Sequence, residues 1–119
     1  MDFEILERMV KIATQKMSDN GEKTYSPDES MTVLRYFFRT YHLVFGQHHQ
    51  MPSLRQITDA VAKMPIIQSP GERENIEVTA DEYMELIDAY FCTRFPKCDY
   101  GLSHFFSGNV RFYRYKEVF

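Results

Sequence analysis

The segment from Ser26 to Gly46 constrains the fold of this 119-residue chain most strongly, because helix signals stand at both of its ends. Ser26, Pro27 and Glu29 supply an N-cap, a proline at the first helical position and a capping-box partner, and Gly46 supplies a stop. The residues between these signals are apolar nearly all round the helix. This pattern predicts a helix over 27–45 that its neighbours surround at the centre of the domain.

Apolar residues recur at helical spacing in three further segments, residues 3–17, 53–64 and 80–92. Capping boxes open the last two of these segments, one made by Ser53 with Gln56 and the other by Thr79 with Glu82. Residues 65–78 hold a Pro-Gly pair and several charges, and we predict a long loop there.

The C-terminal third of the chain leaves two structures open. Asp99 is placed to cap a short helix over 100–107, which is the favoured interpretation, whereas the alternative pairs 102–106 with 110–116 in a hairpin. The second run has the aromatic and β-branched content of a strand in either case. We therefore predict a single domain, residues 1–119, that is mostly α with α+β as the alternative. Four to five helices surround the central one, and a strand or small hairpin ends the chain.

Charge is unevenly distributed along the chain. The net charge is -3 overall, but residues 1–88 carry -6 and residues 89–119 carry +3. The start of the chain is charged and resembles no signal peptide, so we expect a cytoplasmic protein with free thiols at Cys92 and Cys98. The longest apolar stretch, residues 33–45, is interrupted by charged side chains and is too short to span a membrane.

The basic, aromatic C-terminal segment, residues 94–119, predicts contact with nucleic acid. Lys and Arg neutralise phosphate charge, and exposed rings stack on bases. The candidate nucleic-acid-binding residues are Arg94, Lys97, His104, Asn109, Arg111, Arg114 and Lys116. A structural alternative accounts for the same residues, in which a C-terminal strand packs its rings on the helices and keeps its Arg and Lys side chains in water.

Residues 52–61, PSLRQITDAV, resemble the P-S-x-R-x-I-x-x-A-x opening of the helix-turn-helix in winged-helix repressors. The resemblance implies a DNA-binding unit. In it, a preceding helix at 31–45 is followed by a tight turn, a recognition helix and a β-wing. This chain has a proline and a long loop in place of the tight turn, and acids on helix 80–92 where a DNA-reading helix carries Arg, Lys, Asn or Gln. A second winged-helix arrangement uses 100–107 as the reader and 110–116 as the wing.

The competing class is a protein-binding inhibitor or adaptor. An acidic helix face and nearby rings are of the kind found at interface hot spots. The candidate partner-binding residues are Asp81, Glu85, Asp88, Tyr113 and Tyr115. Small acidic helical proteins without an active-site signature are similar, in general type, to regulatory proteins with which bacteriophages and mobile elements block host factors, including anti-CRISPR proteins.

Motifs for catalysis and metal binding are absent from the sequence. Cys92, Cys98 and His104 lack the close pairing of structural zinc ligands. His104 with Cys98 or Ser103 would form a nucleophile pair, but there is no G-x-S-x-G, no glycine-rich phosphate loop and no H-E-x-x-H. We therefore expect a non-enzymatic regulatory protein that has no cofactor and no metal.

Overall fold

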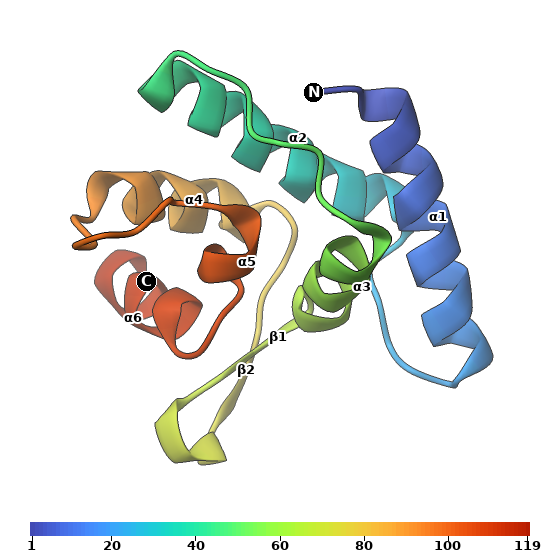
Figure 1. Cartoon of the computed structure of the whole chain (residues 1–119). Helices are drawn as coiled ribbons and strands as arrows, with labels where there is room; N and C mark the ends of the chain where they lie inside the picture. The colour runs from blue at the N-terminus through green and yellow to red at the C-terminus, as the bar shows by residue number, and fades with distance from the viewer.

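The chain folds around a long helix that packs between two others (Figure 1). A computed structural model describes the backbone of residues 1–119 and every side chain except that of Glu72. The elements in chain order are α1 (Phe3–Asp19), α2 (Pro27–Phe45), α3 (Leu54–Lys63), β1 (Ile66–Gln68), the 3-10 turn η1 (Pro70–Glu72), β2 (Asn75–Glu77), α4 (Glu82–Cys92), α5 (Leu102–Phe105) and α6 (Val110–Val118). α2 contacts α1 on one side and α4 on the other, while α6 packs on α4 and α3 packs on α1. The mostly helical class with one small hairpin is confirmed.

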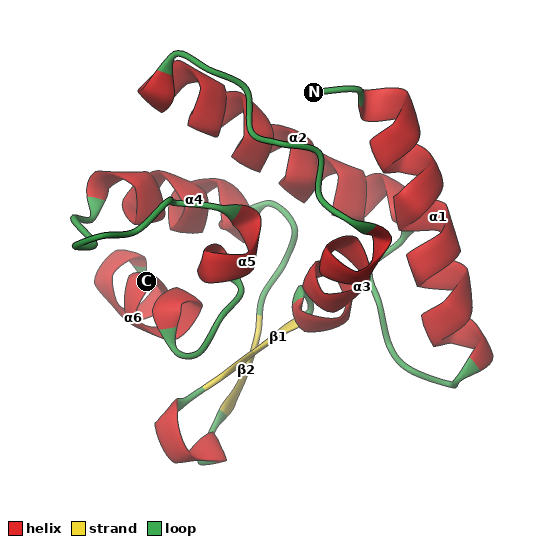
Figure 2. Ribbon diagram, in the orientation of Figure 1, coloured by secondary structure: helices red, strands yellow, loops and turns green.

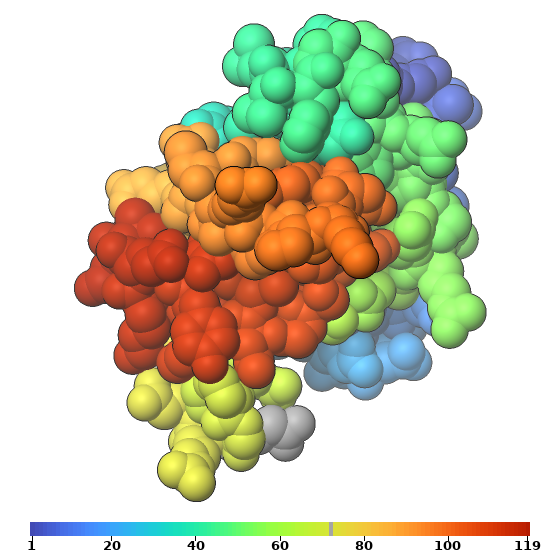
Figure 3. Space-filling view, turned by 60° about the vertical axis from the view of Figure 1, so that its left-hand side comes forward, coloured from blue at the N-terminus to red at the C-terminus, as the bar shows by residue number. Residues whose placement is uncertain are grey.

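The small hairpin lies between α3 and α4, where the sequence predicted a loop (Figure 2). β1 and β2 pair antiparallel with Ile67 opposite Ile76, and Gly71 turns the chain with a φ of 75° that favours glycine. Ile67 is buried while its strand neighbours are exposed, so one anchored side chain fixes the register. The hairpin projects beside the C-terminal segment (Figure 3). The loop prediction for 65–78 was therefore wrong over the paired residues.

The C-terminal strand prediction was wrong, because residues 110–118 form α6. Arg111 and Arg114, three residues apart, are buried on one face of this helix. Packing of that face overrides the strand preference of the local sequence. No wing exists at 110–116, and α3 leads into β1 with no recognition helix between them, so neither winged-helix arrangement is formed. The short helix was confirmed as α5, whose Leu102 and Phe105 side chains are buried.

Capping signals place the helix starts as the sequence predicted. The Ser26 hydroxyl accepts from Glu29 N–H at 3.1 Å, and the Glu29 carboxylate accepts from Ser26 N–H at 3.2 Å. Equivalent reciprocal bonds join Ser53 with Gln56 before α3. Thr79 and Glu82 form the third predicted box, but α4 begins at Glu82 with Asp81 as its N-cap residue, two residues later than this box predicts. These bonds satisfy backbone N–H groups that a helix start leaves without partners.

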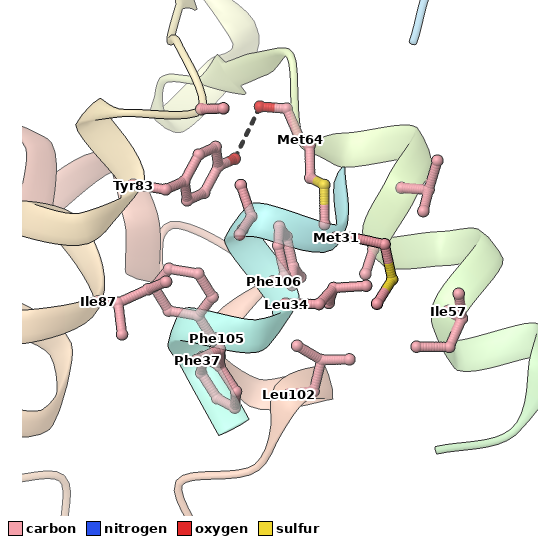
Figure 4. Close-up of a cluster of buried hydrophobic side chains, with 14 of the residues drawn as sticks. Met31, Leu34, Phe37, Ile57, Met64, Tyr83, Ile87, Leu102, Phe105 and Phe106 are labelled. Carbon is pink, nitrogen blue, oxygen red and sulfur yellow. Dashed lines mark hydrogen bonds between the residues drawn. The ribbon is translucent and has the colours of Figure 1, made fainter. Parts of the chain in front are cut away.

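The core forms where α2 meets α4 and α5 (Figure 4). Phe37 of α2 is 1% exposed, and its ring lies 5.4 Å from Phe105 and 6.1 Å from Tyr90. Tyr83 is fully buried, and its hydroxyl donates to the Met64 carbonyl at 2.7 Å. The prediction of a central helix holds for the buried residues of α2, which end at Phe38. Among the described residues, no helix has the length and apolar character to cross a membrane.

Candidate functional site

Arg111, a predicted nucleic-acid-binding residue, is buried and hydrogen-bonded within the fold. It is 7% exposed, and its Nη1 donates to the Lys63 carbonyl at 2.7 Å and to the Tyr83 hydroxyl at 2.8 Å. Its guanidinium lies 4.9 Å from the centre of the Phe106 ring. Burial raises the pKa of Tyr83, and the positive charge of Arg111 opposes that rise. Arg111 therefore joins α6 to α3 and α4 through Nη1, and it also lines a groove between the β hairpin and the start of α6.

Arg114 is also buried and hydrogen-bonded within the chain. It is 8% exposed, and its Nε and Nη2 each donate to a Glu117 carboxylate oxygen at 3.0 Å. Its guanidinium lies 5.3 Å from the centre of the Phe95 ring. The bidentate bond occupies the edge of the Arg114 guanidinium, and the Phe95 ring covers its planar face. Phosphate recognition by arginine requires the same edge and face.

The other predicted nucleic-acid residues are distributed differently. Arg94, Lys97 and Lys116 are exposed cations, and the Lys116 ammonium lies 5.5 Å from the Phe112 ring. Asn109 is exposed and lines a groove of about 620 Å³ between the β hairpin and the start of α6. The C-terminal segment thus offers three exposed cations rather than the five that its sequence contains.

His104 lies in a cluster with Cys98 that the sequence suggested only as a pair. His104 Nδ1 is 3.3 Å from Cys98 Sγ and 2.8 Å from the Tyr90 hydroxyl, and the Tyr100 N–H donates to Cys98 Sγ at 3.2 Å. Burial, followed by the Cys98 thiol, raises the pKa of Tyr90, so its hydroxyl stays protonated. These contacts hold the loop before α5 against α4. Within the described residues, no three His, Cys, Asp or Glu side chains form a group able to hold a metal ion.

The predicted partner-binding residues divide between free and engaged side chains. Asp81, which directly precedes α4, and Glu85 on α4 are exposed, whereas Asp88 accepts a hydrogen bond from the Tyr36 hydroxyl at 2.7 Å. That hydrogen bond raises the pKa of Tyr36. Tyr113 is exposed on α6, and Tyr115 is partly buried and packs against the terminal phenylalanine. Asp88 therefore has a structural role between α4 and α2.

A different surface, at the C-terminal end of α2, groups three exposed apolar side chains in a row. Leu43 is 82% exposed, and Val44 and Phe45 are 51% and 40% exposed. Beside them lies a groove of about 310 Å³ between the end of α2 and the start of α1. Its lining residues are Met1, Phe3, Phe38, Arg39, His42, Leu43 and His48. We call this groove together with Val44 the α2-end surface, and Figure 3 shows its teal and green segments at the top of the molecule.

The charges of the α2-end surface are all of one sign. The Arg39 guanidinium lies over the Phe3 ring at 5.6 Å, and the His42 and His48 rings stack with centres 4.0 Å apart and planes 4° apart. The positive charge of His42 lowers the pKa of His48. No carboxylate stands among the residues that line the groove. The groove therefore combines apolar lining residues with groups that carry positive charge, although the net charge of the protein is negative.

Sequence reasoning missed this surface because the pattern of α2 is apolar on all sides. Such a pattern shows that apolar residues occur on every side, but it does not show how far the neighbouring helices extend along α2. The only available signal was the run Leu43–Phe45 directly before Gly46, at the exposed end of a helix. The loop that follows contributes His48 to the groove, whereas the neighbouring His49 is structural, since its Nε2 accepts from the Leu102 N–H at 3.1 Å.

Comparison with known proteins supplies no relative: no family model, curated protein or solved structure matches this chain.

Proposed function

We propose that this protein is a non-enzymatic binding protein that docks a protein partner on the α2-end surface. The single observation that supports this proposal is the grouping of Leu43, Val44 and an apolar groove at one exposed helix end. Exposed apolar groups that are contiguous and rimmed by polar residues mark interaction sites on soluble proteins. Aromatic and Arg side chains at such a site are typical of the anchors that dominate binding energy.

A protein partner fits this surface better than nucleic acid does. Phosphates and bases need accessible cations and ring faces, whereas this groove is lined mainly by apolar side chains, Met1, Phe3, Phe38 and Leu43 among them. Arg111 and Arg114, which nucleic-acid binding would require, already have internal partners. The proposal keeps the class of inhibitor or adaptor. That the partner is a host factor of a bacteriophage or mobile element stays a prediction.

The proposal is tested by quantitative affinity capture from an extract of the cell that contains the protein, with three forms of the chain. Leu43→Asp places a charge in the α2-end surface, and Ile12→Asp is the matched control on an exposed position of α1, lining another groove. A partner retained by the wild type and by Ile12→Asp but lost from Leu43→Asp supports the proposal. A stable partner that Leu43→Asp retains equally contradicts it.

Nucleic-acid contact is a second candidate, favoured by the exposure of Arg94, Lys97 and Lys116. If these cations bind phosphates, their joint replacement by Ala lowers affinity for a DNA duplex and reduces the salt dependence, because each contact releases about one counterion. Affinity and salt dependence that do not change on this triple replacement remove the second candidate.

A further inference from the structure

We infer that the segment recognised by the α2-end surface is an acidic amphipathic helix, whose carboxylates draw a proton onto the stacked His42–His48 pair. This inference rests on the proposed function, and it adds the chemistry of the partner and a link to pH. It follows from the shape of the groove, from its charge and from the geometry of the two histidines.

The shape of the surface favours a helix with one apolar face. The groove can accept apolar side chains of a partner. Leu43, one of its lining residues, is 82% exposed and can pack against the same partner. Helical partners that bind grooves present apolar anchors at i, i+3 or i+4, and i+7. An anchor inserted into the groove would bury apolar area of Phe3 and Leu43.

The charge of the surface favours carboxylates on the partner. Arg39, His42 and His48 line the groove without an acid among them, so a basic segment meets repulsion there and an acidic one meets attraction. The guanidinium of Arg39 is held over the Phe3 ring, which reduces the side-chain freedom that binding has to remove. This complementarity distinguishes an acidic helix from a neutral or basic one with the same apolar anchors.

The histidine pair links binding to pH. The His42 charge lowers the pKa of His48 in the free protein. The charged groups that act on His48 are His42 and the α-amino group at the start of the chain, and Arg39 lines the same groove; each of these groups is positive when protonated. A partner carboxylate would offset them and raise the pKa of His48 in the complex. Affinity therefore rises as the pH falls through that raised pKa, because the complex binds more protons than the free protein.

The first experiment selects peptides from a phage-displayed library of random 16-residue sequences on the wild-type chain, after depletion on Leu43→Asp. Enriched sequences are expected to combine net negative charge with apolar residues at helical spacing. Enriched sequences that are basic or neutral overturn the inference, yet they leave docking at the α2-end surface standing. If the selection yields no sequence that prefers the wild type to Leu43→Asp, the inference is overturned and the proposed function is contradicted as well.

The second experiment measures the affinity of the best selected peptide by fluorescence anisotropy at pH 7.5 and 5.5. We expect affinity about three- to tenfold higher at the lower pH, within the limit of one proton taken up. Replacing His42 and His48 together by Gln should abolish this difference, whereas Arg39→Gln should weaken binding about fivefold at both pH values and keep the difference. Equal affinity at both pH values, or a pH effect that survives the double replacement, overturns the link to the histidines.

Discussion

Replacement of Arg111 tests whether the basic C-terminal segment is structural. Arg111→Ala removes the two hydrogen bonds that Nη1 donates to Lys63 and Tyr83 and the contact with Phe106. Hydrogen bonds from a charged donor are each worth about 1.5 kcal/mol at the low end, and a ring contact of this kind adds about 0.5 kcal/mol. The free energy of unfolding should therefore fall by about 3.5 kcal/mol.

A graded series separates the two contributions. Arg111→Met keeps an unbranched side chain against Phe106 but loses both hydrogen bonds, so it should cost about 3 kcal/mol. The Tyr83 hydroxyl keeps its bond to the Met64 carbonyl in both variants. Lys116→Ala, an exposed cation on the same helix, is the control and should change stability by less than about 0.5 kcal/mol.

Equilibrium urea unfolding followed by circular dichroism measures these effects. With a denaturant slope of about 1.5 kcal/mol per molar, the Arg111→Ala midpoint should fall by about 2.3 M. If Arg111→Ala is as stable as Lys116→Ala, the structural role of Arg111 is refuted. A stable Arg111→Ala that had lost affinity for DNA would show instead that the side chain serves a nucleic acid.

Three other substitutions give outcomes that the same unfolding assay can check. Ser26→Ala removes the side-chain cap of α2 and should lower stability by about 1 kcal/mol, and no change would contradict the capping role. Phe37→Ala empties a fully packed position and should cost about 3–5 kcal/mol, so a loss below 1 kcal/mol would show that the core is built differently. Leu43→Asp should leave stability within about 0.5 kcal/mol of the wild type, and a large loss would mean that the fold needs this leucine.

Helix positions were predictable where local chemistry decides them. Ser26 with Glu29, and Ser53 with Gln56, close their own hydrogen-bonded boxes within four residues, so no distant contact is needed to specify the start of a helix. The C-terminal helix was not predictable in this way. Residues 110–118 have the composition of a strand, and they become helical because the partners of Arg111 lie about thirty to fifty positions away along the chain.

The candidate site was less predictable than the fold. The sequence located cations correctly in the C-terminal segment but could not show that Arg111 and Arg114 point inward, since only tertiary contacts place Tyr83 and Phe95 beside them. It showed Leu43 as one of many apolar residues in a buried helix. Its exposure follows from the lengths of neighbouring helices, which pattern analysis of a single segment does not contain.

The most direct test of the central claim is a two-ligand NMR titration of the full chain, with amide shifts recorded for each addition. The ligands are the selected acidic peptide and a DNA duplex of the same net charge. The account predicts that the peptide shifts amides around the α2-end surface, from Phe38 to His48, while DNA leaves 94–116 unchanged at physiological salt. Saturable DNA-induced shifts along 94–116, with none from the peptide between Phe38 and His48, would contradict it.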